Sequence, residues 1–161
     1  MKEMHKFYIN GEWVDSLGSE TIEVINPSDE STIGSIAAGT KEDIDVAVAA
    51  AKEAFKSFGL SPKEERIALL ENIISEYEKR SEDLAQTISS EMGAPLWLSN
   101  VAQVTSGLSH FKDTLEVLKT FEFETTENEY ILRKEPIGVI GMITPWNWPM
   151  NQMCTKVASA I

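Results

Sequence analysis

The sequence predicts an α/β fold in which helices flank a parallel sheet, together with a β-hairpin that composition alone would also permit to fold onto its own domain. Three observations support this prediction. Apolar residues recur at helical spacing between residues 41 and 118, and apolar and polar residues alternate between residues 121 and 134. The third observation is an uncharged apolar run, Ile137 to Thr144, that a helical pattern follows after a short turn.

The first forty residues are expected to form strands. Phe7 to Val14 contains Asn10-Gly11 between apolar residues, which is the strongest short-range signal for a β-hairpin. A further strand is predicted over Thr21 to Ile25. His5 lies in a terminal stretch that we expect to fray, so it is an unpromising candidate for chemistry.

Three scaffold helices follow. Thr40 and Asp43 have the spacing of a capping box at the start of the first helix. Ser61 is expected to cap the second helix and Ser81 the third, which ends at Gly93. The residues predicted to face inward are Ile44, Val48, Ala51, Phe55 and Phe58 on the first helix, Ile67, Leu70, Ile74 and Tyr77 on the second, and Leu84, Ile88 and Met92 on the third.

Pro95 leads into a long amphipathic helix. Its predicted buried stripe consists of Trp97, Val101, Val104, Leu108, Phe111, Leu115 and Leu118. His110 lies on this helix without a cysteine or acidic partner at ligand spacing, which is more typical of a surface or core histidine than of a catalytic one. The alternating residues from Phe121 to Lys134 then predict a β-hairpin.

The last part of the chain is the candidate for chemistry. Ile137 to Thr144 fits a strand buried on both faces of a parallel sheet, and Pro149 suits the first turn of a helix. In open α/β sheets, ligands bind beside the loops at the carboxyl ends of the strands. The turn between strand and helix, Pro145 to Pro149, is therefore the candidate site.

Composition excludes several function classes. The 161 residues hold 14 Lys and Arg against 26 Asp and Glu, for a net charge of −12, which disfavours nucleic acid and anionic membranes as partners. A single cysteine gives no disulfide framework and suits a reducing compartment. The amino-terminal segment lacks the apolar core of a signal peptide, and no apolar run approaches membrane-spanning length. A cytoplasmic protein is the expectation.

Residues Thr144 to Pro149, TPWNWP, follow a strand introduced by Glu135 to Val139, EPIGV, and together they resemble the aldehyde dehydrogenase superfamily. The resemblance implies oxidation of an aldehyde to an acid with NAD or NADP, through a cysteine thiohemiacetal and a thioester. It also implies a doubly wound parallel sheet and three parts. These are strands and helices of the cofactor-binding domain (1–120), the hairpin of an oligomerisation arm (121–135), and the first central strand, loop and helix of the cofactor-binding domain (136–161). The resemblance places the catalytic domain outside this chain.

The resemblance assigns roles to the Pro-Trp-Asn turn. Asn147 would donate its side-chain amide to the substrate oxygen as that oxygen becomes an oxyanion. A neutral donor held in place stabilises such a charge without titrating. Ile143, Thr144, Pro145 and Trp146, together with Asn147, would border the cofactor. The alternative is a buried strand followed by a turn that only packs.

Some relatives bind a monovalent cation through backbone carbonyls and one acidic side chain. The matching positions here would be the carbonyls of Val24 and Ile25 and the carboxylate of Glu91. An acidic residue near a helix end is more commonly only solvated.

The central catalytic groups are expected outside this chain. Cys154 lies on an apolar helix face without a basic neighbour to lower its pKa, so it is interpreted as a packing residue. By resemblance, the nucleophilic cysteine, the glutamate that activates water and a lysine that contacts the cofactor ribose lie beyond Ile161. Ile161 falls within a helical pattern without a cap, so we expect the N-terminal part of a longer protein. The 161 residues alone should be inactive and poorly soluble.

Two other functions stay open. A relative on the same scaffold could reduce an acyl-CoA or acyl phosphate through the same thioester, and a relative without catalysis could serve binding or structure. The resemblance also implies a homodimer or homotetramer that associates through residues 121–134. The identity of the aldehyde and the choice between NAD and NADP depend on residues outside this sequence.

Overall fold

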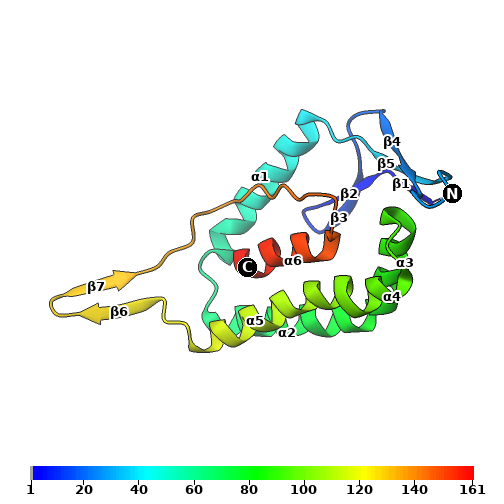
Figure 1. Ribbon diagram of the computed structural model, residues 1–161. Coiled ribbons are helices and arrows are strands. Elements are labelled where there is room, and N and C mark those ends of the chain that lie inside the picture. The colour runs from blue at the N-terminus through cyan, green and yellow to red at the C-terminus, as the bar shows by residue number, and fades with distance from the viewer. Residues whose placement is uncertain (1) are drawn as a thin grey trace.

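The computed structural model describes residues 2–161 and shows a mixed α/β architecture (Figure 1). Short strands gather at one end of the molecule, helices form its body, and a β-hairpin extends from the opposite end. In the described part of the chain, no helix has both the length and the apolar character needed to cross a membrane.

Five strands form the amino-terminal part: β1 (Lys2–Met4), β2 (Lys6–Ile9), β3 (Glu12–Asp15), β4 (Thr21–Ile25) and β5 (Thr32–Ala37). β2 and β3 form the predicted hairpin, and both Asn10 (φ 53°) and Gly11 (φ 83°) have the positive φ that a tight turn requires. β5 was not predicted. It lies between β1, which it pairs in parallel, and β4, which it pairs antiparallel.

The expectation of a frayed start is wrong for His5. Its Nε2 lies 2.7 Å from Ser35 Oγ, next to the parallel pair of β1 and β5. Local composition could not reveal this contact, because β5 lies about thirty residues away in the sequence.

Helix α1 (Lys41–Phe58) confirms the capping box. Thr40 accepts from the Asp43 amide, and the Asp43 side chain accepts from the Thr40 amide at 2.9 Å. Its predicted buried stripe is largely wrong, because Ile44, Ala51 and Phe58 are exposed. The face that carries Ala51, Phe55 and Phe58 forms one wall of a groove of about 280 Å³. Gly138, Val139, Ile140 and Met142 contribute to its lining from the segment after the hairpin.

Helices α2 (Lys63–Lys79) and α3 (Ser81–Met92) follow. Their predicted inward residues are buried or half-buried, and Gly93 ends α3 in the left-handed conformation with φ 75°. The predicted serine caps are wrong. Ser61 Oγ donates to the Phe58 carbonyl and Ser81 Oγ donates to the Tyr77 carbonyl, so each closes the preceding helix instead.

The predicted long helix is present as α4 (Leu96–Leu98), the π-helix η1 (Ser99–Val104) and α5 (Thr105–Thr120) in direct succession. The π-helix shifts the register of the side chains, because each of its turns holds more residues than an α-turn. Trp97 and Val101 are consequently exposed, whereas Val104, Phe111 and Leu115 are buried as predicted.

Strands β6 (Glu124–Glu127) and β7 (Tyr130–Arg133) form the predicted second hairpin, which projects away from the helices (Figure 1). After it, residues 134–148 belong to no strand or helix. The strand predicted over Ile137 to Thr144 and buried on both faces is therefore wrong for the described residues. No strand among the described residues lies beside this segment, so Ile137 and Ile143 remain exposed.

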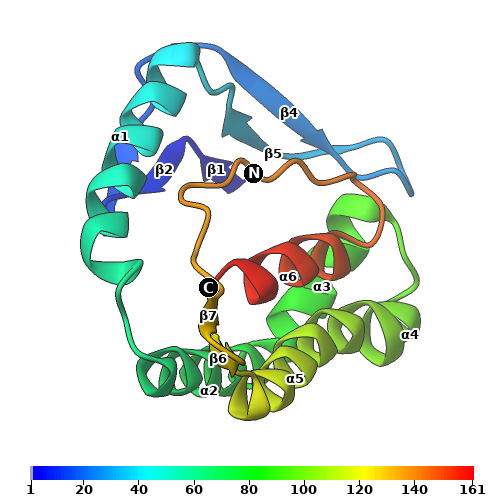
Figure 2. The same cartoon turned by 90° about the vertical axis from the view of Figure 1, so that its left-hand side faces the viewer.

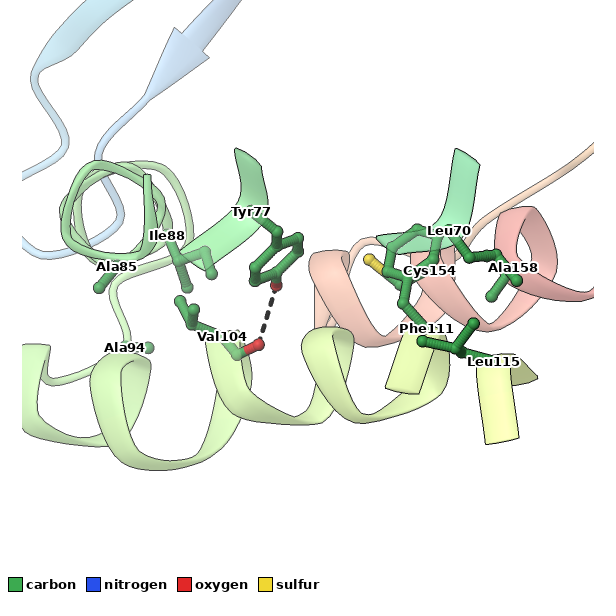
Figure 3. Packing of buried hydrophobic residues seen from close by; sticks show 10 residues of the cluster. All are labelled: Leu70, Tyr77, Ala85, Ile88, Ala94, Val104, Phe111, Leu115, Cys154 and Ala158. Carbon is green, nitrogen blue, oxygen red and sulfur yellow. Dashed lines mark hydrogen bonds between the residues drawn. The ribbon is translucent and has the colours of Figure 1, made fainter. Parts of the chain in front are cut away.

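The core lies between the helices (Figure 3). It consists of Leu70, Tyr77, Ala85, Ile88, Ala94, Val104, Phe111, Leu115, Cys154 and Ala158. These side chains come from α2, α3, η1, α5, α6 (Pro149–Ala160) and the turn after α3. Tyr77 satisfies its buried hydroxyl by donating to the Val104 carbonyl at 2.8 Å.

Candidate active site

The Pro-Trp-Asn turn lies at the surface, immediately before α6. Thr144, Pro145, Trp146 and Asn147 are exposed, and Trp146 retains 83% of its accessible surface. Trp148 adopts the left-handed conformation (φ 55°, ψ 55°), which is strained for a bulky side chain. This residue turns the chain sharply, so that the helix begins at Pro149 as predicted and the exposed Asn147 stands just ahead of it.

Helix α6 anchors this turn to the molecule. The helix lies along α5 in both views of the chain (Figures 1 and 2), and Cys154 and Ala158 bury its inner face. The Trp148 carbonyl accepts from the Gln152 amide at 3.0 Å, which closes the first helical turn. His110 Nε2 on α5 lies 2.8 Å from Asn151 Oδ1 on α6.

The structure supports the interpretation of Cys154 as a packing residue. Its side chain is completely buried among apolar neighbours, and burial raises the pKa of its thiol to about 11. Burial also raises the pKa of Tyr77, whose hydroxyl lies, like Cys154 Sγ, next to Gly107. A thiol with a raised pKa holds little thiolate at neutral pH and is a poor nucleophile.

The residues expected to border the cofactor form an exposed strip. Ile143 retains 91% of its accessible surface, and with Trp146 it presents apolar area to solvent. Large exposed apolar side chains next to each other are typical of surfaces that a ligand or another part of a protein covers. The apolar character of this strip fits the flat face of an aromatic ring.

The positions proposed for a cation lie near the end of β4 and the end of α3. Val24 and Ile25 lie at a shift of register near the end of β4, and Pro27 packs against Gly93, two residues after Glu91. Glu91 is exposed. Within residues 2–161, no group of three or more His, Cys, Asp or Glu side chains could hold a metal ion.

A cavity lies away from the turn. It measures about 710 Å³ and lies between the start of α2, the end of α5, residues 134–140 and the end of α6. Its lining is mainly apolar, with Lys63, Arg66, Lys134 and Glu135 at its polar parts. The turn is exposed among the described residues, so the chemistry proposed for it needs a second wall.

Two features of the site, one contact and one backbone conformation, had no signal in the sequence. His110 and Asn151 are 41 positions apart, and neither residue type indicates a partner at that distance. The left-handed backbone at Trp148 was equally hidden, because tryptophan is not a residue that sequence rules associate with positive φ.

Comparison with known proteins places these features in one family. The sequence profile of the aldehyde dehydrogenase family matches residues 13–161. A Staphylococcus aureus protein (strain bovine RF122 / ET3-1) named as an aldehyde dehydrogenase is 48% identical over 160 residues, which is 99% of this chain and 34% of that protein. The chain therefore spans about a third of the length of the curated relatives it matches.

Solved structures agree in fold. Aldehyde dehydrogenase from Bartonella henselae superposes with a TM-score of 0.96 at 43% identity, over 99% of this chain and 34% of that one. A cysteine-to-alanine mutant of aldehyde dehydrogenase C from Pseudomonas syringae, in complex with NAD+ and octanal, gives a TM-score of 0.95 at 40% identity, over 97% of this chain and 32% of that one. Profile, sequence and fold lead to one conclusion: the chain belongs to the aldehyde dehydrogenase family.

Proposed function

We propose that this chain is the N-terminal third of a full-length protein that oxidises an aldehyde to a carboxylic acid with NAD or NADP. Family membership supports the reaction class, and the NAD+ and octanal bound by the Pseudomonas syringae relative support the cofactor and the substrate class. The reaction proceeds through a thiohemiacetal and a thioester on a cysteine beyond residue 161. The solved structure of that relative carries a cysteine-to-alanine replacement.

The observation that carries the proposal is the exposed amide of Asn147 in a sharply turned loop ahead of a buried helix. During attack on an aldehyde, negative charge develops on the carbonyl oxygen. An amide N–H stabilises that charge without carrying charge itself, provided that it is held in one place. The strained backbone at Trp148 and the anchored helix after it supply this fixed position.

Ile143, Thr144, Pro145, Trp146 and Asn147 are the proposed edge of the cofactor site. When bound, the nicotinamide ring accepts the hydride that leaves the substrate carbon. Ile143 and Trp146 offer apolar surface that excludes water from this region once it is covered.

The proposal has three further parts, a cation site, a subunit interface and a cellular location, and one observation supports each. A cation held by the Val24 and Ile25 carbonyls and Glu91 is supported by the closeness of Pro27, which follows β4, to Gly93 at the end of α3. Association of subunits through residues 121–134 is supported by the projecting hairpin. A cytoplasmic location is supported by the presence of only one cysteine, which is buried and unpaired.

Replacement of Asn147 by alanine in the full-length protein tests the central proposal. We expect kcat/KM for an aldehyde to fall by ~10²–10³, equivalent to ~2.7–4 kcal/mol of transition-state stabilisation, as for single donors in other oxyanion holes. Cofactor affinity should change little because the proposed role of the amide is with the substrate, and Tm should change little because the exposed amide does not pack. Steady-state kinetics with NAD+ and with NADP+ provide the measurement.

The matched control is Cys154→Ala, which removes the only thiol of this chain. It should leave kcat nearly unchanged and cost roughly 1 kcal/mol of stability through lost packing. Near-normal kinetics for Asn147→Ala, combined with loss of turnover in a folded Cys154→Ala protein, would place the nucleophile at Cys154 and overturn the proposal. Turnover of acyl-CoA with NADH, in the absence of aldehyde oxidation, would favour an acyl-CoA reductase.

A further inference from the structure

The contact between His110 and Asn151 joins two helices at the base of the candidate site. His110 lies on α5 and Asn151 in the first turn of α6, and both side chains are half-buried. Their atoms Nε2 and Oδ1 lie 2.8 Å apart. Because an amide oxygen only accepts hydrogen bonds, the imidazole donates from Nε2 in this pair.

The same turn of α6 is fixed at a second point. Gly107, one helical turn before His110, lies so close to α6 that a Cβ atom placed on it would be 3.0 Å from Met150 Cβ and 3.2 Å from Cys154 Sγ. Met150 and Asn151 are neighbours, so packing holds one residue and a hydrogen bond holds the next. Two adjacent attachments restrict both the translation of α6 along α5 and its rotation about its own axis.

The turn that carries Asn147 depends on this anchor. No side chain caps the amino-terminal end of α6, and Trp148 adopts a conformation that the surrounding structure must enforce. On the other side of Asn147, residues 139–146 are exposed and belong to no strand or helix. The first turn of α6 is thus the firm support that the described residues give to the Asn147 amide.

We propose that His110 is a positioning residue, which orients the Asn147 turn by holding Asn151 and does not itself touch the substrate. This inference rests on the proposed function, because it assigns the catalytic donor to Asn147. A shift of about 1 Å in a catalytic group can reduce a rate by about 10²-fold. Loss of one neutral hydrogen bond at the base of a turn should have a smaller effect, of about 10-fold.

The test uses His110→Ala, His110→Gln and Asn151→Ala in the full-length protein. His110→Ala should lower kcat by about 10-fold with little change in KM, whereas a merely structural contact would lower the Tm and leave kcat per folded molecule intact. His110→Gln should restore most of the rate, since a glutamine amide nitrogen can occupy the place of Nε2. Ser109→Ala, an exposed neighbour on the same helix, is the control and should behave like the wild type.

A double-mutant cycle tests whether the two residues act together. His110→Ala should have no further effect on kcat once Asn151 is already alanine. Additive losses in the double variant would overturn the proposal, as would wild-type kcat in His110→Ala.

Hydrogen exchange of residues 144–152 separates this inference from the proposed function. Exchange should be faster in His110→Ala and return toward the wild-type rate in His110→Gln. If Asn147→Ala retains normal kinetics while exchange responds in this way, the proposed function fails and the anchoring of the turn by His110 stands. If Asn147→Ala loses activity while His110→Ala changes neither kcat nor exchange, the proposed function stands and the positioning role is refuted.

Discussion

Asp43 shows how one side chain can connect two segments of the amino-terminal part. Its carboxylate accepts from the Leu17 and Thr40 amides, each at 2.9 Å, and from the Ser16 hydroxyl at 2.9 Å. Backbone hydrogen bonds from Leu17 and Thr40 lower the pKa of Asp43 to about 2. The residue therefore does more than complete a capping box, because it also ties the loop after β3 to the start of α1.

Replacement of Asp43 by asparagine should lower the Tm of the full-length protein at pH 7, because one amide oxygen cannot accept as many hydrogen bonds as a carboxylate. The folded pKa lies below the ordinary value of 3.8, so the contribution of Asp43 is complete above that value and is lost as the pH falls toward 2. The difference in Tm between wild type and Asp43→Asn should consequently shrink over this window. Thermal melts between pH 7 and pH 2.5 provide the measurement.

Glu42→Gln is the matched control for this series. Glu42 is exposed in the same first helical turn, and the substitution makes the same change of charge. Its effect on the Tm should be small at every pH. Equal effects of the two substitutions would show that helix-dipole electrostatics, and not the Asp43 contacts, stabilise this region.

At the scale of elements, the close approach of α5 and α6 depends on Gly107. A Cβ atom on this residue would lie 2.5 Å from the Tyr77 hydroxyl as well as close to Met150 and Cys154. Gly107→Ala should therefore destabilise the protein by ~1–3 kcal/mol, the usual cost of overpacking a core, despite the better helix propensity of alanine. The midpoint of urea unfolding measures this change. Ser109→Ala on the exposed face of α5 should leave the midpoint unchanged or raise it slightly.

The sequence predicted those elements whose determinants are local. The capping box of Thr40 and Asp43, the Asn10-Gly11 turn and the left-handed Gly93 depend on residues within a few positions, and the structure contains all three. The β6–β7 hairpin was found for the same reason, since its alternation and its turn lie in one short stretch.

Elements that depend on distant partners were missed or misplaced. β5 exists because β1 and β4 flank it, and no local pattern marks that arrangement. Ile137 to Thr144 has the composition of a buried strand, yet a strand needs neighbours to bond with, and the described residues supply none there. The candidate site was proposed from the TPWNWP motif, but the contact between His110 and Asn151 beside it is a tertiary one that the sequence could not reveal.

At the scale of the whole molecule, the β6–β7 hairpin exposes apolar side chains that no other described residue covers. Tyr130, Ile131 and Leu132 are consecutive apolar residues on β7, and all three are largely exposed. A two-stranded ribbon of this kind is only marginally stable by itself, and association with a second copy would cover one of its edges and part of its apolar side chains.

We expect the full-length protein to be a homo-oligomer that associates through residues 121–134. Sedimentation velocity at micromolar concentration should show a dimer or a tetramer, and Ile131→Arg should shift it toward smaller species. Val117→Arg, which changes an equally exposed apolar residue on α5, should leave the assembly intact. A wild-type monomer at micromolar concentration would refute the proposal.

The 161-residue chain expressed alone should be poorly soluble and should show no dehydrogenase activity. Ile137 and Ile143 retain 89% and 91% of their accessible surface, and Trp146 retains 83%, so the segment after the hairpin presents uncovered apolar area. Uncovered segments of this composition promote association between chains. Activity should be absent because the proposed nucleophile lies beyond residue 161.

The measurement is the soluble fraction after expression, followed by an assay with an aldehyde and NAD+. Ile137→Ser combined with Ile143→Ser should raise the soluble fraction without producing activity, whereas the same two changes at the exposed Ile44 and Val46 of α1 should help less, because α1 is held by its own helical hydrogen bonds. A soluble monomer of the unaltered chain that melts cooperatively would show that residues 137–146 find cover within these 161 residues. That result would favour a self-contained binding module over the N-terminal part of an enzyme.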